Sequence, residues 1–325
     1  MLTRRTFLAS ASASCLAGPA LAQSYPTQTI RIIAGFPPGG GIDISARLVS
    51  EPLKNALGQT VIVENRTGAA GMLAANTVAK AAPDGHMLLM ATSGEIAISP
   101  HLYKDKMTYD PLRELTPIAL IGIVPCVVVV ATTTPAHNPQ ELIAYAKANA
   151  GKLSFSSSGV GNPQQLAGEL MNMMAGTNVL HVPYRGAAPA VTDVATGAVT
   201  MSFTSLAAAL PLIKADKLRA VAVTSKDRMP QLPDVVPLSE GPGLAGYELL
   251  NWFGMFATGG TPSEIVDRLN DIVNTALTTP SILDKLTVQG IVPRLMTAKE
   301  YASFVESETE KFGKIVQQAN IKLEN

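Results

Sequence analysis

The sequence predicts an α/β protein with mixed, mainly parallel sheets, and three observations support this fold class. Short apolar segments typical of strands alternate along the chain with segments of helical periodicity. Two of these strands, one in each half of the chain, end in glycine-rich turns that lead directly into a helix. No uninterrupted apolar stretch approaches the roughly 20 residues of a membrane span, because the longest candidate, 118–131, contains Gly122 and Pro125.

The expected elements follow one another in order. We expect a strand at 30–36 and a helix beginning near Asp43, in which Pro52 would cause a kink or a local break. Asn138, Pro139 and Glu141 are typical of the cap and first turn of another helix. From 263 the tail is largely helical and amphipathic. The remaining strands are expected at 61–64, 87–92, 118–123, 127–131, 153–158, 179–182, 199–203 and 218–224, with helices at 71–81 and 164–175.

The first 22 residues have the composition of an export signal. Arg4 and Arg5 precede a short apolar core at 7–16, and Ala20-Leu21-Ala22 is a cleavage site of the A-x-A type. The arginine pair fits the twin-arginine route, and an ordinary secretory signal is the alternative. Cys15 is not preceded by the large aliphatic residue of a lipoprotein signal. We therefore expect a mature, soluble chain in the periplasm.

Composition limits the classes of partner and chemistry. The chain is 47% hydrophobic and 15% charged, and without Arg4 and Arg5 it has 23 basic and 25 acidic residues, a net charge of −2. Nucleic acid is therefore not expected as a partner, because binding it requires a basic stripe. Cys126 is the single cysteine left after cleavage and is expected to be a buried small hydrophobe. The four histidines lack the spacing of a metal site, so neither metal nor cofactor is expected.

The two glycine-rich turns, at 37–41 and 156–162, are the strongest candidates for a binding site. Such a turn presents free backbone N–H groups at the positive end of a helix dipole and can hold an anion. One turn alone is a weak signal, since glycines also serve merely to reverse the chain. A pair of such turns can face each other across a cleft and bind one small acidic solute.

An ordered set of segments resembles the Bug-type periplasmic solute receptors of the tripartite tricarboxylate transporter family. These segments cover nearly the whole mature chain. The main ones are YP at 25–26, FPPGG at 36–40, VIVENR at 61–66, GAAG at 68–71, PDG at 83–85, LAGEL at 166–170, HVPYRG at 181–186, KLRAVAVTS at 217–225 and LPDV at 232–235.

The resemblance implies a type II periplasmic-binding-protein fold, a Venus flytrap of two lobes joined by a two-strand hinge. We place lobe 1 at 24–124 plus 245–325 and lobe 2 at 125–244, with the hinge strands near 126–131 and 220–224. The implied function is capture of a small carboxylate for the membrane subunits of a tripartite transporter, or for a sensor, by a monomer without enzymatic activity. The alternative is a periplasmic esterase or amidase that uses the same cleft, although the chain lacks a G-x-S-x-G motif around Ser157.

The resemblance also assigns ligand contacts. The two turns would bind one carboxylate through backbone N–H groups and water, and other loops would meet the distal end of the ligand. Glu95 would repel a second carboxylate if it faced the cleft, or would simply be a solvated glutamate at a helix start. Arg185 would pair with a distal carboxylate or lie on the surface. The expected binding residues are Phe36, Gly39, Gly40, Ser93, Glu95, Ser157, Gly159, Gly161, Asn162, Tyr184, Arg185, Thr204 and Ser205.

Overall fold

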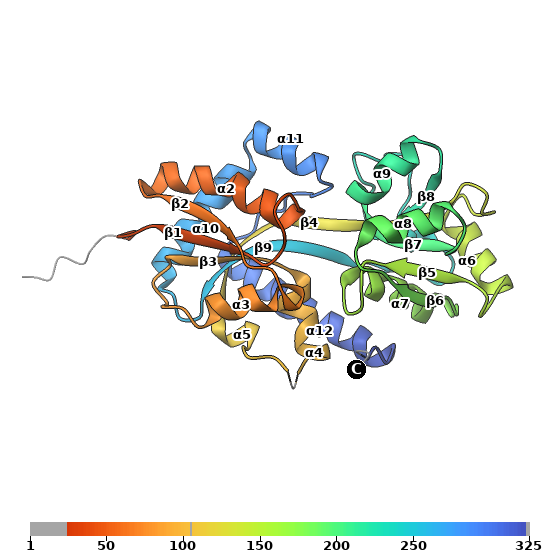
Figure 1. The fold of residues 1–325 in the computed structure, drawn as a ribbon, viewed down its shortest axis with the longest axis horizontal. Helices are drawn as coiled ribbons and strands as arrows, with labels where there is room; N and C mark the ends of the chain where they lie inside the picture. The colour runs from red at the N-terminus through yellow and green to blue at the C-terminus, as the bar shows by residue number, and fades with distance from the viewer. Residues whose placement is uncertain (1–24, 105, 323–325) are drawn as a thin grey trace, which may run out of the picture.

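The structure, a computed structural model, describes residues 25–104 and 106–322. The expected export signal lies outside the described residues. Figure 1 shows two lobes joined by two long strands that run side by side, β4 (Leu115–Ala131) and β9 (Leu250–Thr258). In the part of the chain that the structure describes, no helix has the length and apolar character needed to cross a membrane.

The remaining elements alternate between strands and helices. The strands are β1 (Ile30–Ala34), β2 (Val61–Asn65), β3 (Met87–Thr92), β5 (Ser154–Ser157), β6 (Leu180–Pro183), β7 (Met201–Ser205) and β8 (Leu218–Val223). The α-helices are α2 (Gly41–Leu57), α3 (Met72–Ala79), α4 (Ser99–Leu102), α5 (Pro111–Glu114), α6 (Pro139–Ala148), α7 (Pro163–Ala175), α8 (Ala187–Ala195), α9 (Leu206–Lys214), α10 (Ser263–Leu277), α11 (Pro280–Val288) and α12 (Ala298–Gln318). Short helical turns are η1 (Ala69–Gly71), η2 (Gly94–Ile98), a π-helix, and η3 (Leu238–Glu240).

The strands form one mixed array in the order β2-β1-β3-β9-β4-β7-β5-β6, and β8 also pairs with β4. The pairs β1–β2, β1–β3, β5–β6 and β5–β7 are parallel, as expected where a helix connects neighbouring strands. The four pairs that involve β4 or β9 are antiparallel. This mixed α/β, two-lobed arrangement confirms the predicted fold class.

Strand β4 belongs to both lobes, and this differs from two expectations. Pro125 was expected to end one strand and start another, but β4 is continuous through it. At Pro125 the strand leaves β9, its partner in lobe 1, and from Cys126 it pairs with β7 in lobe 2, so the missing N–H falls at the change of partner. The second connecting strand is β9 rather than the expected 220–224, because β8 pairs only with the lobe 2 half of β4.

The lobe boundaries given above remain predictions, although the strand pairings show how the chain returns. After β8 the backbone comes back alongside its end, and the N–H of Leu249 donates to the carbonyl of Thr224 at 3.1 Å. Strand β9 then begins at Leu250, which lies opposite Pro125. Both connections between the lobes therefore lie side by side.

Local sequence signals explain the two helix starts that matter most. Asn138 caps α6 as expected, since its side chain accepts from the N–H of Glu141. Helix α2 begins at Gly41, where any Cβ would come within 2.8 Å of the Phe253 ring, so only glycine lets this ring pack on the first turn. The predicted break at Pro52 is wrong: α2 continues through it to Leu57, in a helix whose inner face is buried.

Helices cover both faces of the sheet, and three hydrophobic clusters fill the space between the layers. One cluster packs α2, α10 and α11 on lobe 1, and another packs α8 and α9 on lobe 2. The third and largest contains residues of both lobes, including Ile33, Trp252 and Phe203. Trp252 is fully buried there, against Tyr301 and Phe304 of α12.

Candidate ligand-binding cleft

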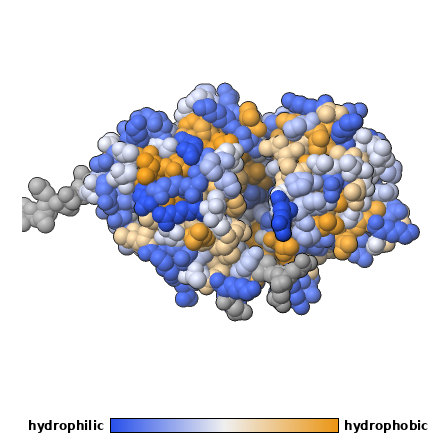
Figure 2. Space-filling view, viewed as in Figure 1, coloured by the Kyte–Doolittle hydropathy of each residue, from blue (hydrophilic) through white to orange (hydrophobic). Residues whose placement is uncertain are grey.

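A cleft of about 580 Å³ lies between the lobes, above the two connecting strands. Figure 2 shows it as a hollow in the middle of the molecule. Its apolar lining includes Phe36, Ile42, Tyr103, Val124, Pro125, Val160, Ala187, Ala207 and Phe253. Its polar lining consists of Thr92, Ser99, Cys126, Ser158, Asn162, Gln164, Ser205, Asn251 and Gln289. Among the described residues, no Asp, Glu, Lys, Arg or His lines this cleft.

The lobe 1 wall contains the uncapped N-terminus of α2. Gly40, the N-cap residue, provides no side-chain cap, and the backbone ladder begins only with Ile44, whose N–H donates to the carbonyl of Gly40 at 2.9 Å. The N–H groups of Gly41 and Ile42 therefore precede the ladder. Gly40, Gly41 and Ile42 all line the cleft. This wall offers backbone donors at the positive end of a 17-residue helix.

Asp43 holds the preceding loop in place. Its carboxylate accepts from the N–H of Gly39 at 3.0 Å, from Arg47 and from the side-chain amide of Asn65. The same amide donates to the carbonyl of Phe36. Burial opposes ionisation of Asp43, but these donors outweigh it and lower its pKa to about 2. Asp43 is therefore ionised and fixes the loop 36–41 from behind.

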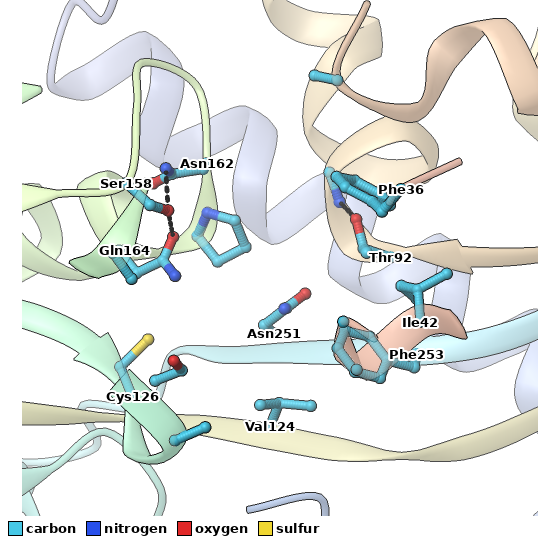
Figure 3. A pocket seen from close by; sticks show the side chains of 18 of the residues that line it. Phe36, Ile42, Thr92, Val124, Cys126, Ser158, Asn162, Gln164, Asn251 and Phe253 are labelled. Carbon is cyan, nitrogen blue, oxygen red and sulfur yellow. Dashed lines mark hydrogen bonds between the residues drawn. The ribbon is translucent and has the colours of Figure 1, made fainter. Parts of the chain in front are cut away.

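In the lobe 2 wall, the side chains of Asn162, Ser158 and Gln164 form a hydrogen-bonded chain. A backbone N–H fixes which end of the Asn162 amide donates. The N–H of Gln165 donates to Asn162 Oδ1, which makes Nδ2 of Asn162 the donor to Ser158 Oγ at 2.9 Å. The Ser158 hydroxyl in turn donates to Gln164 Oε1 at 3.0 Å. The oxygen of Gln164 is thus occupied, and its Nε2 amide is the donor left on the cleft side (Figure 3).

The floor contains Asn251 of β9. Its Oδ1 accepts from the hydroxyl of Ser93 at 2.8 Å and from the N–H of Trp252 at 2.9 Å. Since both donors approach the oxygen, the Nδ2 amide of Asn251 is the group left to the cleft. Cys126 lies nearby (Figure 3), and burial raises the pKa of its thiol to about 12, so it is protonated at neutral pH.

The structure brings five of the predicted residues to the cleft wall: Phe36, Gly40, Gly161, Asn162 and Ser205. The other eight are not on that wall: Gly39, Ser93, Glu95, Ser157, Gly159, Tyr184, Arg185 and Thr204. Three predicted backbone donors are bound to side chains, since the N–H of Gly39 donates to Asp43, that of Gly159 to Ser157 and that of Gly161 to Gln165. Ligand contact by any of these residues remains a prediction.

Glu95 is fully buried, so the expectation of a solvated helix-start glutamate is wrong. It lies in η2 behind the cleft wall, where its carboxyl group accepts hydrogen bonds from the backbone N–H and the hydroxyl of Thr92. Burial raises the pKa of this carboxyl to about 7, against the effect of those donors.

Tyr184 and Arg185 lie away from the lining. The hydroxyl of Tyr184 donates to Asp193 at 2.5 Å, within lobe 2. Arg185 is exposed on the surface, in agreement with the second of its two interpretations. Neither residue is therefore placed to clamp a distal carboxylate in this arrangement of the lobes.

Ser157 and His181 form the one serine–histidine hydrogen bond among the described residues, with 2.7 Å between Oγ and Nε2. Ser157 is fully buried, and its hydroxyl also contacts the carbonyl of Gly159 at 2.8 Å. Burial lowers the pKa of His181 to about 4, and no carboxylate contributes to that shift. The pair braces the turn, and neither residue lines the cleft.

Sequence reasoning missed several lining residues, among them Ile42, Gln164 and Asn251. For β9 a signal existed: in a strand, alternate residues face opposite sides. Trp252 enters the core, so Asn251 and Phe253 must face the other way, toward the cleft. For Gln164 no comparable pattern exists, because its orientation depends on Ser158 and Asn162.

Residues 45–321 match the family described as tripartite tricarboxylate transporter family receptor. The UPF0065 protein in the tcbD-tcbE intergenic region of Pseudomonas sp. strain P51 is 37% identical over 90% of this chain and 87% of its own length. Protein BugT of Bordetella pertussis is 32% identical over 95% of this chain and 94% of its own.

Two solved structures carry ligands. R. palustris Rpa4515 with adipate superposes with a TM-score of 0.79, at 34% identity over 92% of this chain and 99% of that one. MatC from Rhodopseudomonas palustris with bound malate superposes with a TM-score of 0.74, at 31% identity over 90% of this chain and all of that one.

The two-lobed fold with one cleft over two connecting strands defines a solute receptor of the periplasmic-binding-protein class. More specifically, the chain belongs to the tripartite tricarboxylate transporter family of receptors, as the sequence segments predicted.

Proposed function

We propose that this protein is a periplasmic receptor that captures a small organic acid and delivers it to the membrane subunits of a tripartite transporter. The bound species would be a carboxylate held between the N-terminus of α2 and the amide-lined lobe 2 wall. Both walls and the floor belong to one chain, so a monomer suffices. The adipate and malate of the two relatives support this class of ligand.

The observation that carries the proposal is the combination of donors and charge in the cleft. The described lining presents backbone N–H groups of α2 and the amides of Gln164 and Asn251, but no charged side chain. A carboxylate placed there replaces water by directed donors and meets no competing anion. A cationic solute would meet the positive end of a helix without any carboxylate to compensate it.

The apolar lining sets the shape of the preferred acid. Ile42, Val124 and Phe253 flank the polar groups of the lobe 1 wall and the floor (Figure 3). An acid with a short hydrocarbon chain or a ring between its carboxylate and its far end would bury that apolar surface at roughly 25 cal/mol per Å². Closure of the lobes on such a ligand is a shift between open and closed populations, driven by contacts with both lobes.

The geometry does not favour the hydrolase alternative. The Ser157 hydroxyl is fully buried behind the lobe 2 wall, whereas a nucleophile must reach the reacting carbonyl. Among the described residues, no carboxylate pairs with the neighbouring His181 to orient it as a general base. We therefore propose binding without turnover.

The test is a thermal-shift and titration screen of the mature protein, refolded to remove carried ligand. The panel contains adipate, malate, benzoate and glutamate, each with its uncharged amide. At 100 times its dissociation constant a ligand adds about 2.7 kcal/mol to the free energy of unfolding, which raises Tm by a few degrees. Stabilisation by an acid but not by its amide is expected, with the acid recovered unchanged.

Two outcomes would contradict the proposal. Equal stabilisation by an acid and its amide would show that the negative charge is not recognised. Consumption of an added ester or amide, lost in a Ser157→Ala variant, would establish the hydrolase instead.

A further inference from the structure

We propose that Glu95 makes carboxylate capture proton-linked: protonated Glu95 frees the hydroxyl hydrogen of Thr92 for the ligand, and ionised Glu95 withholds it. The inference rests on the proposed function, since it requires that a carboxylate binds in the cleft. It goes further, because it assigns regulation of that binding to a residue outside the cleft wall.

The geometry is a three-residue relay at the end of β3. Thr92 lines the cleft, and Glu95 lies directly behind it with no exposed surface. The backbone N–H of Thr92 donates to Glu95 Oε1 at 2.9 Å, and the Thr92 hydroxyl is hydrogen-bonded to Glu95 Oε2. The N–H of Gly94 donates to Thr92 Oγ1 at 2.9 Å. Figure 3 shows Thr92 facing the cleft beside Phe36.

When Glu95 is ionised, the Thr92 hydroxyl has no donor to spare. A hydroxyl group has one hydrogen and two lone pairs, and an ionised carboxylate can only accept. The hydrogen therefore goes to Glu95 Oε2, and one lone pair receives the N–H of Gly94. Only the second lone pair of the threonine oxygen is left toward the cleft. It cannot hydrogen-bond to a ligand carboxylate oxygen, because both atoms are acceptors.

Protonation of Glu95 reverses the direction of one hydrogen bond. The carboxylic acid donates its own O–H from Oε2 to Thr92 Oγ1, while Oε1 still accepts the N–H of Thr92. Both lone pairs of the threonine oxygen are then occupied, by Glu95 and Gly94, and its hydrogen turns to the cleft. Thr92 becomes a donor to the ligand carboxylate, an interaction between a neutral donor and a charged acceptor worth roughly tenfold or more in affinity.

The surroundings shield the Glu95 carboxyl group from solvent, and no cation of the described residues pairs with it. Gly71 of η1 packs so closely that a Cβ there would lie 2.9 Å from the Glu95 carboxyl carbon. Two phenols face η2: Tyr109 donates to the backbone carbonyl of Glu95 at 2.6 Å, and Tyr301 approaches from α12. Burial is accordingly the largest cause that raises the Glu95 pKa to about 7.

The charged groups of the neighbouring elements either have other partners or, like Lys299, Glu306, Glu310 and Lys314 of α12, are exposed on the surface. On α4, the ring of His101 contacts the carbonyl of Thr309 at 2.8 Å. On α12, Glu308 pairs with Lys311, and on α5, Glu114 pairs with Lys80 and Arg113 with Asp110. The described parts of α3, η1 and β3 present no titratable side chain to Glu95.

Because protonation of Glu95 and ligand binding are linked, the direction in which affinity changes with pH follows. Near and above the pKa of the empty receptor, binding takes up a fraction of a proton, because the ligand favours the protonated form, and for a tenfold preference this uptake reaches about half a proton per ligand. The dissociation constant rises with pH toward a limit set by the Thr92 donor. For a tenfold limit we expect it to be about sixfold higher at pH 8.5 than at pH 6.5, a range in which simple carboxylic acids are fully ionised.

The experiment is isothermal titration of the mature protein with adipate and with malate at pH 6.5, 7.5 and 8.5. Each titration is run in two buffers of different ionisation enthalpy, which measures the protons taken up per ligand. Wild type should bind about sixfold more weakly at pH 8.5 than at pH 6.5 and take up about half a proton per ligand at pH 7.5. Glu95→Gln keeps a donor toward Thr92 and an acceptor for its N–H, so it should bind tightly at every pH without proton uptake.

Thr92→Val is the matched second variant, because it removes the hydroxyl without changing the shape of the side chain. It should bind weakly at all three pH values, as wild type does at pH 8.5. If the dissociation constant of wild type changes by less than twofold between pH 6.5 and pH 8.5, with no proton uptake, the inference is overturned and carboxylate capture still stands. Binding of neither acid at any pH would remove the proposed function together with its regulation. If Glu95→Gln fails to fold, the proton count of wild type decides the matter.

Discussion

The hydroxyl of Ser93 donates to Oδ1 of Asn251 at 2.8 Å, across 158 positions of sequence, and so joins the ends of β3 and β9 beneath the cleft. The N–H of Trp252 donates to the same oxygen. The amide of Asn251 therefore has a fixed polarity, with its donor on the cleft side. Ser93, whose contact with the ligand remains a prediction, thus positions Asn251, which lines the cleft.

Replacing Asn251 by Asp should weaken carboxylate binding at least tenfold. Ser93 and Trp252 would still donate to one oxygen, but the other would bring a negative charge to the cleft floor and repel the ligand. Titration with adipate at pH 7 measures the effect. Asn55→Asp adds the same charge at an exposed position of α2 and should change little. Equal loss in both variants would mean that net charge, and not the cleft floor, determines binding.

Replacing Gly40 by Leu should reduce carboxylate affinity at least tenfold and leave the fold intact. The backbone of Gly40 is extended, with φ −80°, and a Cβ there meets only the carbonyl of Pro37 at 3.5 Å. The added side chain covers the free N–H groups at the start of α2. Ala56→Leu, exposed near the end of the same helix, is the control. Circular dichroism checks the fold, and unchanged affinity of Gly40→Leu would contradict the role of this helix start.

Replacing Asp43 by Asn should lower the free energy of unfolding at pH 7 by about 2 kcal/mol. The lowered pKa of Asp43 means that its stabilisation is present above the ordinary carboxyl pKa and is lost as pH falls through about 2. Urea unfolding at several pH values measures the difference, which should shrink below about pH 4. Asp271→Asn, exposed on α10, should have no such effect, and a difference independent of pH would refute the ionic explanation.

Glu95 should make the empty receptor less stable as pH rises. Its folded-state pKa of about 7 exceeds the ordinary value, so its relative stabilisation is complete below that ordinary value and is lost as pH rises through about 7. Between pH 5 and pH 8 wild type should lose up to about 3 kcal/mol relative to Glu95→Gln. Chemical unfolding without ligand measures this, and parallel curves for the two proteins would contradict it.

The sequence predicted the fold well where local patterns and tertiary contacts agree. Asn138 and Glu141 mark a helix start on their own, and the short apolar run at 87–92 already indicates β3. Pro125 was misread because its effect depends on the partners of β4, which change at that residue. Pro52 was misread because the packing of α2 outweighs the cost of a proline in its interior.

The site was predictable only in part, for a related reason. Glycine-rich turns after strands are visible in the sequence, and the turns at 37–41 and 156–162 do line the cleft with Gly40 and Gly161. The orientation of Gln164 and Asn251 is not visible, since it is set by hydrogen bonds with residues on other elements. Nor is the burial of Glu95, which results from Gly71 and α12 packing around it.

Strand β4 also determines how the molecule folds. It pairs with β9 in one lobe and with β7 and β8 in the other, so each lobe needs a different half of the same strand to complete its sheet. One hydrophobic cluster continues through both lobes as well. We therefore expect that neither lobe folds autonomously and that the chain assembles and unfolds as one cooperative whole.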